Sequence, residues 1–298
     1  MWNLYRGKER INVELKNGHK IEVVAQDAYF ISLAVKEGLN VNRIPYYLKN
    51  GVSYIRLHLL TLMIKNGLSE NKAVENIKQD KFIYKGLPIT IHLPPNNLGD
   101  PINEIFWRGD YSSLDVQDKI VIDIGGFVGD SAIYFALKGA TKVIMLEPSP
   151  KLFEYALRNI KENNLEEKII PLNAAYGGKE ETLIDENLAI GGLLKQDENG
   201  VKIRQYTLEE LVKNYYIDRA VLKMDCEGCE YALLDEPDNV FNKIDELQIE
   251  YHYGYKTLLS KLELVGFGVN FTKPKKIYVK NADNPFLQLG YVYAKRRS

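Results

Sequence analysis

A glycine-rich turn after an apolar stretch is the first feature of this sequence that could do chemistry. Residues 120–124 are mostly apolar but include Asp123, and they lead into Gly125-Gly126-Phe127-Val128-Gly129-Asp130-Ser131. Glycines at such a point allow a tight bend and let a ligand approach main-chain amides. A dinucleotide-binding turn requires glycine where Phe127 stands, so close approach of a pyrophosphate is disfavoured. The spacing favours a compact zwitterion, with Asp123 facing an amine and the loop amides facing a carboxylate.

A second acidic residue ends the next apolar stretch. Glu147 follows residues 142–146 and directly precedes Pro148. A carboxylate at the end of the second strand of a nucleotide-binding sheet can accept hydrogen bonds from both hydroxyls of a ribose. The two features predict S-adenosyl-L-methionine as cofactor, bound by Asp123, Gly125, Gly126, Gly129, Asp130, Ser131 and Glu147. The alternative interpretation is an ordinary turn followed by a solvated glutamate.

Three more carboxylates follow the apolar stretch 220–224, at Asp225, Glu227 and Glu230. In a doubly wound sheet, ligands bind beyond the carboxyl ends of the strands. Asp225 is therefore expected to face the cofactor's sulfonium or amine and to act in catalysis. Glu227 is expected to accept or orient the proton of an acceptor hydroxyl. The alternative is that Glu227 and Glu230 are only charges in the first turn of a short helix.

A histidine lies near the end of a further apolar stretch. Glu250 and His252 are two positions apart, so they share one face of a strand. His252 is the best histidine candidate for a general base, because its pKa can lie near neutrality; the alternative is a hydrogen-bonded structural histidine. A divalent metal held by Asp225, Glu227, Glu250 or His252 is a further hypothesis, but the favoured interpretation requires no metal.

The two cysteines have the Cys-x-x-Cys spacing of redox motifs. Cys226 and Cys229 are the only cysteines in the chain, and the thioredoxin context and the second pair needed for tetrahedral zinc are both missing. We therefore expect two small buried side chains beside the site.

Alternating strands and helices position these residues. Strands are predicted at 120–124, 142–146, 169–172, 220–224 and 247–251, with helices between and after them, and 267–271 and 291–294 complete the sheet. This order predicts an α/β fold with a doubly wound, mostly parallel, seven-stranded sheet.

The first hundred residues differ in pattern. Hairpins are predicted at 11–25 and 82–93, with a helix over 27–35 between them. The turn-forming cluster 94–101 predicts a boundary, with an α+β domain at 1–99 and the cofactor-binding domain at 100–298. The smaller domain is expected to cover the substrate or mediate oligomerisation.

Composition excludes several classes of protein. The net charge is −1, so no overall attraction to nucleic acid or an anionic membrane is expected. No apolar run reaches the roughly 18 residues of a membrane span, the first residues lack a secretory signal, and two cysteines cannot form a disulfide scaffold. These features predict a cytoplasmic location.

The motifs also resemble a known family. The glycine turn, residues 138–148, 207–211 and 222–230, and Glu250-Tyr251-His252 are similar to the FkbM-type, Rossmann-like S-adenosylmethionine-dependent methyltransferases over roughly 100–298. The resemblance implies methyl transfer, usually to an oxygen. It also implies that Asn173 contacts the adenine; alternatively, Asn173 only forms a turn after its strand.

The acceptor is expected to be a hydroxyl on a small molecule or glycan. Trp107 and Tyr111 could pack against it, or could be ordinary core aromatics. Basic runs at 273–276 and 295–297 keep an RNA substrate open as an alternative. A non-catalytic cofactor-binding module is the other alternative, and a homodimer is also left open.

Overall fold

The computed structural model describes residues 10–14, 18, 20–94, 101–178, 180–184, 200–278 and 286–297. The chain divides into two compact units, one of residues 1–91 with 100–108 and the other of residues 92–99 with 109–298. The predicted boundary near residue 100 is thus close to the division, although most of the turn-forming cluster, residues 95–100, lies outside the described residues.

The first unit combines two hairpins with a set of helices. Both predicted hairpins and the predicted first helix are confirmed. The elements are β1 (Arg10–Glu14), β2 (Lys20–Val24), α1 (Ala25–Lys36), η2 (Val41–Arg43), α2 (Ile44–Lys49), η3 (Tyr54–Arg56), α3 (Leu57–Lys65), α4 (Glu70–Lys78), β3 (Lys81–Tyr84), β4 (Leu87–Thr90) and the π-helical η4 (Asn103–Arg108).

Aromatic packing explains why residues 101–108 belong to the first unit rather than the second. The ring of Phe106 lies 5.0 Å from that of Phe82 and 5.1 Å from that of Tyr84, both on β3. Trp107 also packs on Phe82, at 5.2 Å between ring centroids. Trp107 therefore makes a core contact, as in the plainer of its two interpretations. The role expected for this unit stays a prediction.

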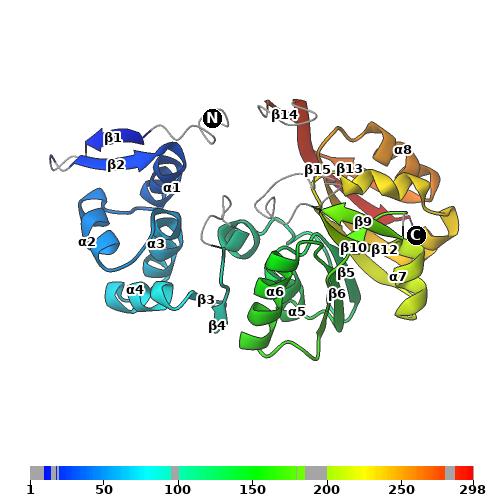
Figure 1. Ribbon diagram of the computed structural model, residues 1–298, viewed down its shortest axis with the longest axis horizontal. Helices are drawn as coiled ribbons and strands as arrows, with labels where there is room; N and C mark the ends of the chain where they lie inside the picture. The colour runs from blue at the N-terminus through cyan, green and yellow to red at the C-terminus, as the bar shows by residue number, and fades with distance from the viewer. Residues whose placement is uncertain are drawn as a thin grey trace. The chain divides into compact units, whose positions relative to one another are not determined.

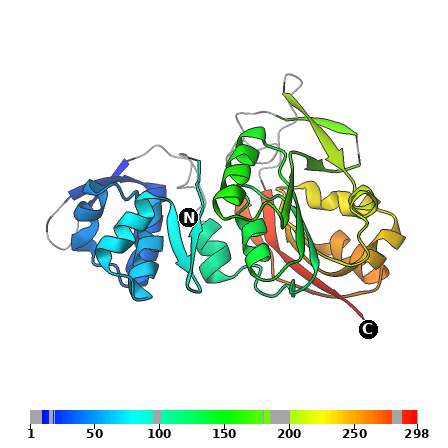
Figure 2. The same cartoon turned by 90° about the horizontal axis from the view of Figure 1, so that it is seen from below.

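The second unit is a sheet between two layers of helices (Figures 1 and 2). Seven strands follow the order β13-β15-β12-β11-β5-β6-β7, and β14 pairs with β15. Neighbours from β12 to β7 are parallel, whereas β15 is antiparallel to both β12 and β13. The predicted doubly wound α/β fold is confirmed. Its elements are β5 (Ile120–Ile124), α5 (Asp130–Leu137), β6 (Lys142–Leu146), α6 (Pro150–Glu162), β7 (Ile169–Leu172), α7 (Leu208–Asn214), β11 (Ala220–Met224), η6 (Cys229–Asp235), η7 (Asp238–Lys243), β12 (Ile244–Tyr251), α8 (Lys256–Leu264), β13 (Phe267–Phe271), β14 (Lys275–Tyr278) and β15 (Phe286–Arg296).

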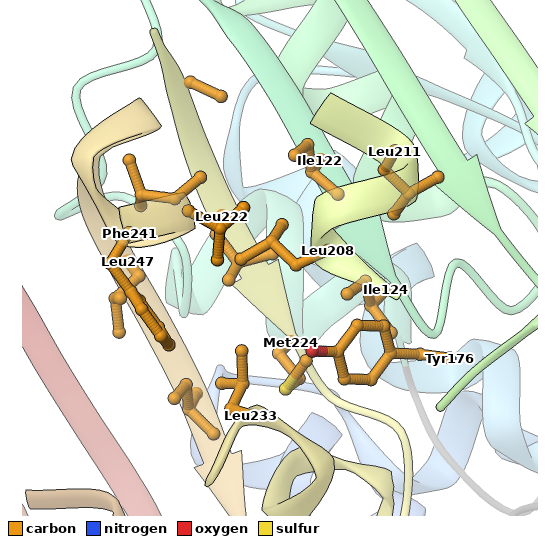
Figure 3. Close-up of a cluster of buried hydrophobic side chains, with 14 of the residues drawn as sticks. Ile122, Ile124, Tyr176, Leu208, Leu211, Leu222, Met224, Leu233, Phe241 and Leu247 are labelled. Carbon is orange, nitrogen blue, oxygen red and sulfur yellow. The ribbon is translucent and has the colours of Figure 1, made fainter. Parts of the chain in front are cut away.

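The strands form because both of their faces are apolar, which suits a sheet covered on both sides. On one face, Ile122 of β5 and Leu222 of β11 pack with Leu208 of α7 in a fully buried cluster (Figure 3). Since alternate strand residues point to opposite faces, Asp123 and Lys223 lie on the other face, the one covered by α5 and α6. The carboxyl ends of β5, β6, β11 and β12 meet along one edge of the sheet.

A smaller three-stranded sheet was not predicted. Its order is β8 (Ala175–Tyr176), β10 (Val201–Tyr206) and β9 (Glu181–Ile184). Within the described part of the chain, no helix combines the length and apolar character needed to cross a membrane.

Candidate active site

The glycine turn packs directly on the backbone that follows β11. Gly125 has a φ of +80°, and a Cβ built there would lie 1.8 Å from the carbonyl oxygen of Asp225. Glycine is therefore required both by the left-handed backbone and by the lack of space. Gly129, with a φ of +82°, is the N-cap residue of α5. The tight bend predicted for this turn is present, and it packs the turn against the backbone of Asp225.

A buried ion pair lies beneath the turn. Asp123 and Lys223 are 0% and 2% exposed, and Lys223 Nζ lies 3.0 Å from Asp123 Oδ1. Lys223 also donates to the carbonyl oxygen of Gly125 at 2.6 Å, and the Ser131 hydroxyl donates to Asp123 Oδ2 at 2.6 Å. The expectation that Asp123 faces the amine of a ligand is therefore corrected: the amine it engages is that of Lys223.

Electrostatics keep this lysine charged. Burial disfavours the charge on Lys223, but the Asp123 and Asp225 carboxylates outweigh it and hold the pKa of Lys223 above its usual value. Lys223 was not among the site residues expected from the sequence, in which it interrupts the otherwise apolar stretch 220–224. A lysine at a strand position buried on both sides needs a buried acid as its partner, and this was the signal that could have identified the pair.

The structure brings Glu147 and Asn173 together on the β6 side of the turn. The Glu147 carboxylate accepts hydrogen bonds from the backbone amides of Phe127 at 2.9 Å and Ser149 at 2.8 Å. The Asn173 amide donates to the carbonyl oxygens of Glu147 and Pro148. Burial raises the pKa of Glu147 to about 8, although the two amides act in the opposite direction.

Asp130 lies at the start of α5, in the same region. It is 3% exposed, and burial raises its pKa to about 7, with the charge of Lys223 opposing the shift. Burial thus raises the pKa values of both Asp130 and Glu147.

Tyr111 is a site residue whose role the sequence did not reveal. It is buried, packs against Phe135 at 5.8 Å between ring centroids, and donates its hydroxyl hydrogen to Asp225 Oδ2 at 3.0 Å. Instead of offering a face to an acceptor, Tyr111 fixes the orientation of a half-buried carboxylate.

His252 lies between two carboxylates. Its Nε2 is 3.2 Å from Glu227 Oε2 and its Nδ1 is 3.0 Å from Glu230 Oε1, while its backbone amide donates to Glu230 as well. Burial acts to lower the pKa of His252, but the two glutamates outweigh this effect and raise it well above its usual value. In this geometry His252 is a cation that orients Glu227, which corrects its expected role as a general base.

The glutamates flanking His252 differ in exposure. The Glu227 side chain is 42% exposed, whereas that of Glu230 is fully buried. Glu230 lies in the first turn of η6, as the alternative interpretation expected, but it is more than a helix charge, because its carboxylate binds His252 and the amide of Gly228. Glu227 remains accessible to a substrate.

Metal binding at this cluster was one of the hypotheses from the sequence. Asp225, Glu227 and His252 each offer one ligand atom, and these atoms lie within 4.8 Å of one another. Burial raises the pKa of Glu250 well above its usual value, and the nearby charge of Asp225 raises it further. Within this cluster the His252 imidazole already contacts one of the carboxylates, that of Glu227, at 3.2 Å.

Cys226 and Cys229 are joined by a disulfide. The expectation of two separate small side chains is therefore wrong. Their Cα atoms are 5.5 Å apart, within the range that a disulfide spans. Both residues are half-buried.

The buried pair provides a test of this description. We expect Lys223→Met to lower the free energy of unfolding by about 3–5 kcal/mol, because it leaves Asp123 charged and buried without a partner. Adding Asp123→Asn should recover much of this loss, since it removes the unpaired charge. Urea unfolding of the parent, Lys223→Met, Asp123→Asn and the double variant measures the coupling energy of the two residues; additive effects would contradict the ion pair.

The sequence matches one family of methyltransferase domains and one viral protein. Residues 123–267 match the sequence profile of the methyltransferase FkbM domain. The chain is also 34% identical over 132 residues to "Uncharacterized protein 158B" of Sulfolobus islandicus rod-shaped virus 1, a match that covers 43% of this chain and 61% of the viral protein.

Solved structures resemble the chain weakly. TYW2 of M. jannaschii in complex with AdoMet is 15% identical, with a TM-score of 0.38, covering 73% of this chain and 86% of that one. Trm5b of Pyrococcus abyssi is 13% identical, with a TM-score of 0.41, covering 73% and 56%. Likeness at this level does not identify a substrate. The profile match, together with the sheet and its glycine turn, shows that residues 123–267 form an FkbM-type methyltransferase domain, as the sequence motifs predicted.

Proposed function

We propose that this protein transfers a methyl group from S-adenosyl-L-methionine to a hydroxyl oxygen of a small molecule or glycan. The observation that carries the proposal is the contact between the glycine turn and the Asp225 backbone. This contact puts the cofactor-binding turn beside two half-buried carboxylates, Asp225 and Glu227, at one edge of the sheet.

The residues of the β6 side fit the nucleoside part of this cofactor. Each oxygen of Glu147 accepts one backbone amide and keeps a second acceptor position, which suits the two hydroxyls of a ribose. Asn173, anchored beside Glu147 through its amide nitrogen, keeps its carbonyl oxygen to accept from an adenine. Asp225 is the carboxylate that faces the positive charge of the ligand, and Gly126, Asp130 and Ser131 complete the turn.

Methyl transfer from this cofactor requires little of the protein beyond positioning of the two reactants. The bound cofactor supplies a methyl group already activated by its sulfonium. The protein must hold the acceptor oxygen in line with that methyl group and take up the hydroxyl proton. Glu227 is the proton acceptor in this proposal, because it is accessible and oriented by His252. Asp225 is held by Tyr111 and stabilises the nearby positive charge.

A nucleic-acid acceptor has less support. The net charge is −1, and part of the basic run at 295–297 makes contacts within the protein. Arg296 donates to the backbone carbonyls of Phe241 and Ile244, and Lys295 lies 3.9 Å from Glu246. Binding of RNA with a steep salt dependence would favour this alternative instead.

We expect Glu227→Gln to lower the turnover of methyl transfer by about 100-fold, because the amide cannot accept the hydroxyl proton. Affinity for the cofactor should change less than twofold. The assay follows labelled methyl groups into hydroxyl-bearing small molecules and glycans, with calorimetry for cofactor binding. Glu166→Gln, on an exposed turn, is the matched control. Full turnover in Glu227→Gln would exclude this role, and cofactor binding without transfer to any acceptor would favour a non-catalytic module.

Glu147 should make cofactor binding depend on pH. Its pKa of about 8 in the free protein means that it is mostly protonated at pH 6. Ribose hydroxyls donate better to the ionised form, so we expect affinity to rise from pH 6 to pH 8. Because glutamine cannot ionise, the Glu147→Gln variant should lose the part of the pH dependence of cofactor affinity that comes from Glu147. Contributions from Asp130 and from the ligand are the same in the parent and in the variant. Identical pH profiles by calorimetry would contradict the ribose contact.

We expect chelation to leave the reaction intact, because His252 already pairs with Glu227, one of the carboxylates that a divalent ion would need as a ligand. Methyl-transfer rates are compared before and after dialysis against EDTA, with re-addition of Mg²⁺ or Mn²⁺ as the control. A loss that either ion restores would assign the cluster to a metal instead.

A further inference from the structure

The disulfide encloses the residue to which we assign proton acceptance. Cys226 and Cys229 close a ring of four residues that contains Glu227 and Gly228. Asp225 precedes the ring directly and Glu230 follows it directly. The whole chain contains no further cysteine, so neither sulfur has an alternative partner within the molecule.

The backbone inside the ring has an unusual conformation. Glu227 has a φ of +56° and Gly228 a φ of +122°. Residues other than glycine rarely adopt left-handed backbone angles, and they do so only where the surrounding structure holds them there. Few contacts do so here: the Gly228 amide donates to Glu230 at 2.8 Å, and the Cys229 amide donates to Cys226 at 3.5 Å. Besides these hydrogen bonds, the disulfide restrains the backbone of the ring covalently.

This conformation brings Glu227 to His252. The Glu227 carboxylate is more exposed than its partner, so the 3.2 Å contact with His252 depends on where the backbone presents it. His252 itself directly follows β12, and Glu230 binds both its backbone amide and its ring. A looser ring would therefore displace Glu227 while leaving His252 in place.

We propose that the Cys226–Cys229 disulfide is a positioning element for Glu227, and that its reduction reversibly lowers methyl transfer while cofactor binding persists. The inference rests on the function proposed above. Asp225 is anchored by other contacts, since its amide donates to Ile124 of β5 and its carboxylate accepts from Tyr111. The residues assigned to the nucleoside lie on the β6 side of the turn.

The redox step is ordinary thiol–disulfide exchange. A dithiol reductant attacks one sulfur, forms a mixed disulfide, and leaves as a cyclic disulfide, while the Cys226–Cys229 bond breaks and gains two electrons and two protons. The sulfurs are half-buried, so a small reductant can reach them. Cys226 Sγ lies 3.8 Å from Glu230 Oε2, and a carboxylate this close disfavours a thiolate. The products are therefore expected to be neutral thiols.

The experiment compares oxidised and reduced forms of the 298-residue chain. Alkylation and intact mass first establish the redox state, with dithiothreitol as the reductant. We expect reduction to lower kcat on the order of tenfold to a hundredfold, with cofactor affinity changed less than twofold and kcat restored by reoxidation. The double variant Cys226→Ser/Cys229→Ser is the control: it should show the reduced rate from the start and no response to dithiothreitol.

Hydrogen exchange gives a readout that does not depend on activity. Reduction should speed exchange at the Gly228 amide and leave the His252 amide protected. Free thiols in the air-oxidised protein, or unchanged kcat and exchange after verified reduction, would overturn the proposal. If neither redox form transfers methyl groups, the proposed function fails, whereas the exchange data still decide whether the disulfide orders the ring.

Discussion

The buried pair of Lys223 and Asp123 is the interaction on which the site depends. Two charges removed from water are stable only when each faces the other and their remaining hydrogen-bonding positions are filled. Here the lysine also holds the carbonyl oxygen of Gly125, and the aspartate also holds Ser131. The pair therefore links β5, β11, the glycine turn and the start of α5. The glycine turn and the segment that carries Asp225 are held together by this one set of contacts.

On the other side of β11, a single buried glutamate has a similar role. Glu230 binds both the backbone and the ring of His252, and its other oxygen binds the Gly228 amide. It thus joins the end of β12 to the loop that carries Glu227. The resulting order of acid, charged imidazole and acid leaves one exposed carboxylate with a fixed neighbour. Such an arrangement suits a reaction in which orientation matters more than strong base catalysis.

Burial gives the acids of this site different properties. The pKa of Glu147 rises to about 8 and that of Asp130 to about 7 because water is excluded from both. Glu227, which is partly exposed, lies beside a cation instead. Residues of the same chemical type are therefore suited to different tasks: the buried acid of β6 to hydrogen bonding with a neutral ligand group, and the accessible acid to proton uptake.

The sequence by itself determined the doubly wound sheet, the glycine turn, and the strand ends that carry Glu147, Asp225 and His252, because apolar periodicity and glycine spacing are local signals. Tertiary structure decided which of these groups remain free. Partners such as Lys223 for Asp123 and Tyr111 for Asp225 lie about a hundred positions away in the chain, and no local pattern specifies such a pairing. The same holds for charge: whether a histidine is a base or a cation depends on the carboxylates that folding places around it, and only the folded chain contains that information.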